Sequence, residues 1–233
     1  MTIPIEMPNL ISGAGDTPGQ GACVMQAVAW LASNGDEWTD APACTHRVLR
    51  RVAIRVNDNI TDTARRQLWP LVPRLLGTAT GDRAADNRIS VALAAWAAER
   101  VLPLIKDEKR HATAAERIGK ARAWLTRNEP PAAAAADAYA ADAYGGAADA
   151  YAAAGAAYAA YAADAYAYGG AAAADAYAAV AYAAYGGQQI KFLTDLLDEY
   201  DHITGRTTPP QITTAQWAAL HDALTGHAEG QQP

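Results

Sequence analysis

The amino-acid sequence predicts an all-α protein, with stacked antiparallel helical hairpins, solenoid-like or as a bundle, and a helical layer rich in alanine and tyrosine. Residues 132–185 contain 33 alanines in 54 positions, and alanine has the highest helix propensity. On both sides of this tract apolar residues recur at helical spacing, and no stretch alternates with the period of a strand. Helical hairpins stacked in order are therefore the economical architecture.

The first elements follow from breakers and caps. Residues 1–20 contain six glycines and prolines and are expected to form an irregular arm. The spacing predicts a helix over residues 22–32, with Asn34-Gly35 as its stop. A second helix places Val48 to Val56 on an apolar face and four arginines on the opposite face. We expect Thr45 to cap its N-terminus and the run 57–59 to close it.

Three further helices are predicted before residue 130. Thr61 or Asp62 can cap the first, which prolines 70 and 73 should kink or break. After a loop over residues 77–86, an apolar pattern over residues 89–105 indicates the next helix. A shorter pattern over residues 112–125 indicates the last, and the two prolines at 130 and 131 then mark a boundary.

The C-terminal part returns to ordinary helical patterning. An apolar stripe over residues 190–197 predicts a helix that ends at Gly205. Thr213 or Thr214 should cap a final helix, in which Trp217, Leu220 and Leu224 form the buried face. The domain organisation expected is an arm over 1–20, a helical domain over 21–129, alanine-rich helices packed on it over 132–187, C-terminal helices over 188–225 and a tail over 226–233.

Tyrosine and aspartate are arranged regularly in the alanine-rich tract. Gly-Gly pairs at 145, 169 and 186 divide it into three segments, and the triplet Asp-Ala-Tyr occurs five times. At about 100° per residue, the tyrosines of the middle segment share one side of a helix and its two aspartates lie elsewhere. We expect a packed helical layer, with a ligand groove or partner surface, or a disordered segment, as the alternatives. The candidate binding residues are Tyr151, Tyr158, Tyr161, Tyr166, Tyr168, Asp149 and Asp164.

Charge is unevenly distributed along the chain. Residues 1–131 carry a balance of +3 and residues 132–233 a balance of −9. The basic residues of the first part are scattered among acids, so nucleic acid is not an expected partner. No long apolar run and no signal-like N-terminus are present, which predicts a soluble cytoplasmic protein without membrane contact.

Two cysteines are the main candidates for chemistry. Cys23 lies at a predicted helix start, where the helix dipole can lower a thiol pKa, as in papain-like hydrolases. Such enzymes also need a histidine base and usually a sheet to hold it. The nearest candidate base, His46, lies in a predicted helical region with no strand, so a packed thiol is the preferred interpretation. Cys44 and His46 could join Cys23 around a metal, but no second ligand pair completes a zinc set. The sequence therefore predicts no catalytic residue, no metal site and no cofactor.

Two stretches of the chain resemble known families. The segments GACVMQAVAWL, WTDAPAC, VND and LWPLVPRLLGT, which begin at residues 21, 38, 56 and 68, resemble an uncharacterised helical domain of actinobacteria and their phages, over about residues 10–106. The segments AWAAERVLPL and ARAWL, which begin at residues 95 and 121, together with the alanine-rich helices, resemble immunity proteins of polymorphic-toxin systems. These resemblances imply an actinobacterial or actinophage origin and a helical binding function.

The function expected is that of a non-enzymatic helical binding protein, an immunity or phage counter-defence factor that binds a partner protein. A basic partner would suit the acidic second part of the chain. Three alternatives stay open: a protein that binds or sequesters a small ligand such as a nucleotide, a structural or assembly protein of an actinophage, and a Cys23-dependent hydrolase. A homo-oligomer is compatible with each of these.

Overall fold

The computed structural model describes residues 4–104, 108–127 and 188–226. The described residues form helices joined by irregular segments and contain no strand, so the predicted all-α class is confirmed. The alanine-rich tract predicted over residues 132–187 lies outside the described residues, and the stacking of hairpins stays a prediction. The chain divides into two compact units, the first formed by residues 1–80 and 207–233 and the second by residues 81–206.

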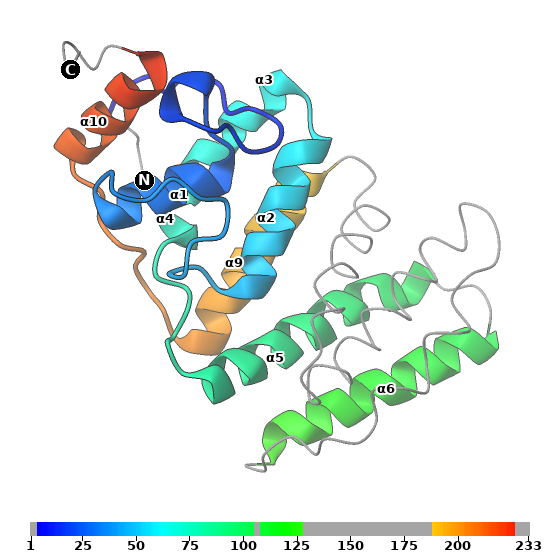
Figure 1. Cartoon of the computed structure of the whole chain (residues 1–233). Helices are drawn as coiled ribbons and strands as arrows, with labels where there is room; N and C mark the ends of the chain where they lie inside the picture. Colours follow the sequence, from blue (N-terminus) through cyan, green and yellow to red (C-terminus); the bar gives the residue numbers. More distant parts are fainter. Residues whose placement is uncertain (1–3, 105–107, 128–187, 227–233) are drawn as a thin grey trace. The chain divides into compact units, whose positions relative to one another are not determined.

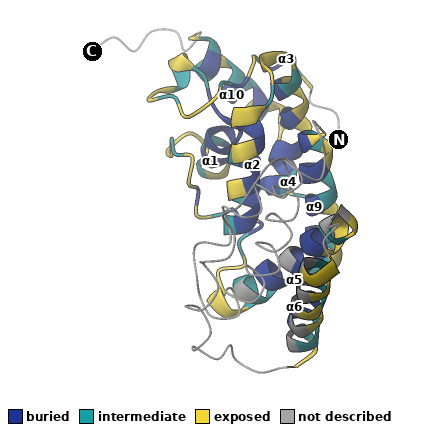
Figure 2. Cartoon of the chain, turned by 90° about the vertical axis from the view of Figure 1, so that its right-hand side faces the viewer, coloured by how far each residue is buried: buried dark blue, intermediate teal, exposed yellow. Residues whose placement is uncertain are grey.

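The first unit is built around α1 (Val24–Ser33), which packs against α2 (Arg47–Asn59), α4 (Val72–Leu75) and α10 (Thr214–Thr225). Seven of the ten residues of α1 are buried, and Figure 2 shows the helix largely in the colour of buried residues. A helix so enclosed tolerates few polar side chains, and its sequence is mostly alanine, valine and other apolar residues. It forms the core of the unit.

Prolines divide the segment between α2 and α4, as predicted. The chain forms α3 (Asp62–Arg65), then the 3-10 helix η2 (Arg66–Leu71) with Pro70 inside it, and then α4. Because proline lacks a backbone N–H, an uninterrupted α-helix cannot pass through this stretch. The turns nevertheless bury Trp69, whose ring packs edge-on against Trp217 of α10 with ring centroids 6.1 Å apart.

The helix ends of the first unit largely follow local rules. Asn34 closes α1 in the left-handed conformation, with φ 56°, and the Thr61 hydroxyl caps α3 by accepting a hydrogen bond from the Ala64 N–H. Thr213 caps α10 in a reciprocal capping box with Gln216. The arm expected over residues 1–20 is irregular in its described part, apart from the 3-10 turn η1 (Pro18–Gln20), and α1 begins at Val24, two residues after the predicted start.

The predicted cap of α2 is wrong. His46, not Thr45, occupies the N-cap position. The Thr45 hydroxyl instead donates to the carbonyl of Leu75, 3.3 Å away at the end of α4. A buried carbonyl at the end of another helix therefore takes the hydroxyl that a local cap would use.

The second unit consists of α5 (Arg83–Val101), the short η3 (Leu102–Leu104), α6 (Glu108–Thr126) and α9 (Gln189–Thr204). α5 packs against both α6 and α9, and α5 and α6 run side by side in Figure 1. Its buried surface is rich in alanine, which allows close approach, and Trp96 contacts Phe192 of α9 with ring centroids 6.0 Å apart. The guanidinium of Arg100 covers the Trp96 ring at 4.0 Å.

Helix boundaries in the second unit differ from prediction at two starts and one end. The apolar pattern predicted a helix as far as residue 105, but α5 ends at Val101 and is followed by η3. α5 begins at Arg83 instead of Ile89, because the Asp82 carboxylate accepts hydrogen bonds from two N–H groups of the first turn. Polar residues that looked like a loop thus form the first turns of a capped helix. α6 likewise begins at Glu108, one turn before the predicted start. The predicted stop of α9 at Gly205 is confirmed, with φ 69°.

Within the described ranges, no helix has the length and apolarity needed to cross a membrane.

Candidate functional site

The start of α1 holds the cysteine that the sequence singled out. Cys23 is the N-cap of α1 and is 2% exposed. The Gln26 side chain accepts a hydrogen bond from the Cys23 N–H at 3.1 Å, and the Cys23 sulfur faces the Gln26 N–H in return. This is the reciprocal geometry of a capping box, with a thiol in the place usually taken by a hydroxyl. Cys23 therefore satisfies backbone groups that a helix start would otherwise leave unpaired.

The Gln26 side chain also holds the N-terminal arm. Its amide donates to the carbonyl of Gly15 at 2.6 Å and accepts from the Gly15 N–H at 3.0 Å. The indole of Trp38 donates to the same Gly15 carbonyl at 2.8 Å. A β-carbon at Gly15 would lie 2.5 Å from the carbonyl oxygen of Gly21, so this close approach requires glycine.

A second buried amide, Asn57 of α2, connects the arm to α1. Its Oδ1 accepts from the Val24 N–H at 3.2 Å, and its Nδ2 donates to the Ile11 carbonyl at 2.8 Å. The Asp58 carboxylate accepts from the same Nδ2 at 3.0 Å and from the Gly13 N–H at 2.8 Å. We call Gln26, Asn57 and Asp58 the arm clamp, because their side chains bind the backbone of residues 11–15.

Arg65 of α3 contacts the arm clamp through the backbone of Asn57. The Arg65 guanidinium donates to the carbonyl of Asn57 at 2.7 Å and to that of Ile60 at 3.0 Å, and it pairs with Asp62. The Arg65 side chain is 7% exposed, so these partners compensate for the desolvation of its charge. The C-terminal end of α2 is thereby fixed to the turn that follows it.

The environment of Cys23 disfavours thiol chemistry. Burial raises the pKa of Cys23 above its usual value of 9.0, hydrogen bonds from the Gln26 and Met25 N–H groups lower it, and Asp40 and Asp58 raise it further. Reactive cysteines occupy the opposite environment, partly exposed and electropositive, where the thiolate is stabilised. The helix start predicted for Cys23 is confirmed, but desolvation outweighs the lowering effect expected there. The arrangement suits a structural thiol.

The loop before α2 is also held by backbone contacts. The His46 N–H donates to the Thr78 hydroxyl at 2.9 Å, and the Cys44 carbonyl accepts from the Ala79 N–H at 3.0 Å. His46 is 1% exposed, whereas Cys44 is half-buried and its sulfur lies 3.8 Å from the Thr45 hydroxyl. Within the described part of the chain, no three His, Cys, Asp or Glu side chains are grouped to hold a metal ion, and neither cysteine forms a disulfide.

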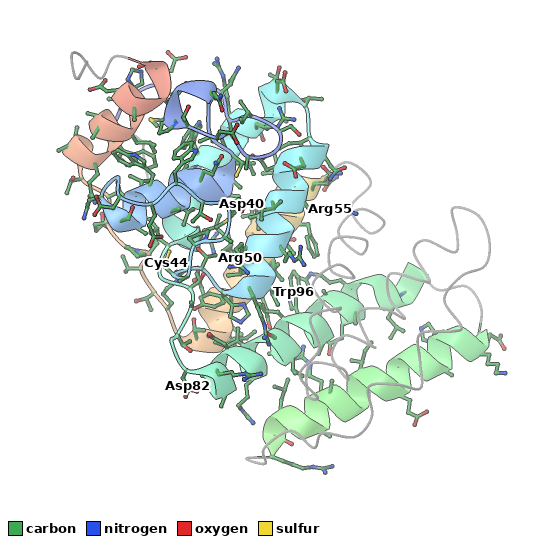
Figure 3. All side chains as sticks on the ribbon, viewed as in Figure 1. Asp40, Cys44, Arg50, Arg55, Asp82 and Trp96 are labelled. Carbon is green, nitrogen blue, oxygen red and sulfur yellow. The ribbon has the colours of Figure 1, made fainter. Side chains whose placement is uncertain are left out.

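α2 also presents an outer surface that sequence reasoning did not interpret as functional. Opposite its buried valines the helix carries Arg47, Arg50, Arg51, Ile54 and Arg55, which we call the arginine face. Arg51 and Arg55 are exposed, and the other three are half-buried. Figure 3 labels Arg50 and Arg55 on this helix. The missed signal is the absence of any acidic residue between Arg47 and Arg55, which leaves the charge of this stretch unbalanced.

The binding residues that the sequence proposed are not among those that the structure describes. These are Tyr151, Tyr158, Tyr161, Tyr166, Tyr168, Asp149 and Asp164. The described residues instead bring together the arm clamp, which sequence reasoning missed because its contacts join residues up to 46 positions apart. Asn57 was expected only to close its own helix.

Comparison of the chain with models of protein families, with curated proteins and with solved structures finds no match.

Proposed function

We propose that this chain is a non-enzymatic helical binding protein that acts by occupying a partner protein, as an immunity or phage counter-defence factor would. The observation that carries the proposal is the environment of Cys23. Cys23 is, by residue type and position, the described residue best suited to nucleophilic chemistry. It is buried, it completes a helix cap, and its pKa is raised. Such a thiol stabilises the fold but is poorly prepared to attack a substrate.

The arm clamp supports the same proposal. Buried polar side chains in this region bind backbone groups of the arm and of α1, so they fix an irregular segment in one conformation. A surface that is ordered before binding loses less conformational entropy when it meets a partner. The arm and the helices it crosses therefore form a framework suited to recognition.

The charge of the chain indicates what the partner should carry. Residues 132–233 hold a balance of −9, and the five Asp-Ala-Tyr triplets combine carboxylates with aromatic rings. Tyrosine is enriched in protein interfaces, and an acidic surface accelerates encounter with a basic one. We infer that the tract binds a basic protein surface. Its contacts would be Asp149, Asp164, Tyr151, Tyr158, Tyr161, Tyr166 and Tyr168.

The decisive experiment neutralises the tract in the full chain. Asn replaces the five aspartates Asp137, Asp142, Asp149, Asp164 and Asp175, and proteins that co-purify from the native host are compared with those of the unaltered chain. We expect the basic partner to be lost from the variant, and its Kd, once it is purified, to rise at least about tenfold.

A matched control neutralises five exposed acids elsewhere, through Asp16→Asn, Asp36→Asn, Glu37→Gln, Asp40→Asn and Glu108→Gln. This control changes net charge equally and should retain the partner. Cys23→Ser should retain it too. If the tract variant keeps every partner of the unaltered chain, the tract is not the binding surface. If Cys23→Ser alone abolishes function while the protein stays folded, the non-enzymatic proposal is wrong.

A further inference from the structure

The turn that follows α1 contains the one Asn-Gly pair of the sequence, Asn34-Gly35, and both residues are exposed. An asparagine that precedes glycine is chemically labile, because the next backbone nitrogen can attack the side-chain amide carbon and glycine has no side chain to hinder that approach. Every other asparagine of the chain precedes a residue that carries a side chain. Asn34 is therefore the asparagine best suited to covalent change without an enzyme.

The reaction at such a pair needs only water. The Gly35 nitrogen bonds to Cγ of Asn34, the bond from Cγ to Nδ2 breaks, and ammonia leaves with the proton that the Gly35 nitrogen loses. Water then opens the resulting succinimide ring at one of its two carbonyl carbons, which gives aspartate or isoaspartate. One water is consumed and one ammonia is released, and either product bears a new carboxylate.

The folded turn holds the pair in a conformation that opposes this attack. Asn34 is left-handed, with φ 56° and ψ 36°. At this ψ, tetrahedral geometry places the Gly35 nitrogen nearly opposite the Asn34 β-carbon about the Cα–C bond, and hence away from Cγ. The N–H groups of both residues also donate to the Trp30 carbonyl, that of Gly35 at 2.9 Å. The turn must open before the nitrogen can reach Cγ.

A side chain of α10 holds the labile amide as well. Nε2 of Gln216 donates to Oδ1 of Asn34 at 3.0 Å, across 182 positions of the chain. Gln216 is also the third residue of the capping box that starts α10 at Thr213. The orientation of the Asn34 amide therefore depends on α10. This hydrogen bond is exposed to water, and bonds of that kind open without global unfolding.

We propose that Asn34 is a site of spontaneous deamidation, whose rate is set by opening of the turn after α1 and by the contact with Gln216. Either product places a negative charge at the C-terminal end of α1, where the helix dipole disfavours it. Isoaspartate also adds one atom to the main chain within the turn and so disrupts its hydrogen bonds to Trp30. The acidic tract and Cys23 take no part, so the proposal stands or falls separately from the proposed function.

The test follows deamidation of the full chain in mildly alkaline buffer, which promotes loss of the Gly35 proton. Peptide mapping by mass spectrometry detects the gain of about 1 Da at residue 34. The folded chain is compared with the chain unfolded in urea, and a synthetic peptide of residues 30–40, with and without urea, corrects for the effect of urea itself. We expect the folded chain to be modified at Asn34, at least about tenfold more slowly than the unfolded chain.

Two variants separate the Gln216 contact from the stability of α10. Gln216→Ala removes the bond to Asn34 and should accelerate deamidation about threefold. The control Thr213→Ala removes the hydroxyl that caps α10 from the other side of the capping box and should react within about twofold of the unaltered chain. Thermal melting checks that each variant is folded.

Three results would overturn the proposal. The first is a folded chain that gains no mass at Asn34 while the unfolded chain is converted. The second is an equal rate in the folded and unfolded chains after correction for urea. The third is an equal rate in the Gln216→Ala and Thr213→Ala variants, which would show that the contact with Gln216 has no influence of its own.

Discussion

Removal of one buried amide should release the N-terminal arm. Asn57 is 0% exposed, and its side chain satisfies the Val24 N–H and the Ile11 carbonyl at once. In Asn57→Ala both groups lose their partner. A buried polar group left unsatisfied costs about 1–3 kcal/mol, so the two together should reduce the free energy of unfolding by about 3 kcal/mol. For a chain of this size that corresponds to a fall in Tm of about 10 °C.

The same helix provides a matched control. Asn59 is exposed, and its amide donates only to the Arg55 carbonyl one turn earlier, at 2.8 Å. Water can replace that bond, so Asn59→Ala should change the free energy of unfolding by about 0.5 kcal/mol or less. Asn57→Asp should lie between the two alanine variants, because it keeps an acceptor for Val24 but places a second carboxylate beside Asp58.

Urea denaturation followed by tryptophan fluorescence measures these differences, since Trp30, Trp38, Trp69 and Trp217 lie in the first unit. Hydrogen exchange gives a local readout. The Ile11 N–H donates to the Ala22 carbonyl at 2.9 Å, and its protection should fall in Asn57→Ala but not in Asn59→Ala. Equal effects of the two alanine variants, in both measurements, would refute the role assigned to the arm clamp.

Three further predictions concern other parts of the structure. Gly15→Ala should destabilise the protein by about 1–3 kcal/mol, because its β-carbon would lie 2.5 Å from the Gly21 carbonyl oxygen. A β-carbon at Gly19 meets nothing within 4 Å, so Gly19→Ala should be near neutral in the same thermal melts. In a Cys44→Ser background, iodoacetamide should alkylate Cys23 of the folded chain slowly. Because the pKa of Cys23 is raised, the alkylation rate should still be rising above pH 9.0. Fast alkylation near neutral pH would contradict this. Arg122 of α6 pairs with Glu99 of α5 at 2.7 and 2.8 Å, and both side chains are about 40% exposed. A double-mutant cycle should therefore give a coupling energy below about 1 kcal/mol that declines with added salt. A coupling energy of several kcal/mol would show that the pair is effectively desolvated.

Helix ends could be predicted where the signal is local. Thr61 and Thr213 cap the helices that directly follow them, and Gly205 closes the helix that directly precedes it. In each case the partner is a backbone group a few residues away, so the residue type alone indicates its role. The same rule failed at Thr45, whose hydroxyl found a carbonyl 30 positions further along the chain.

In the candidate site the contrast between predictable local signals and unpredictable long-range contacts is stronger. The sequence correctly placed Cys23 at a helix start, but the effect of that position on its pKa depended on how deeply the surrounding helices bury the thiol. Asn57 looked like a residue that ends its own helix, and in the folded chain it caps the start of another. Nothing in the local pattern specifies that the partner lies 33 residues earlier.

By itself the sequence determined the helical class, most helix ends and the opposite charges of the two parts of the chain. Those properties depend on residue type, spacing and immediate neighbours, which can all be read from the amino-acid sequence. Only the tertiary structure decided that the arm is clamped by Gln26, Asn57 and Asp58, and that Cys23 is buried. These depend on which distant groups meet and how much water remains between them, because burial sets both the cost of an unsatisfied polar group and the pKa of a thiol.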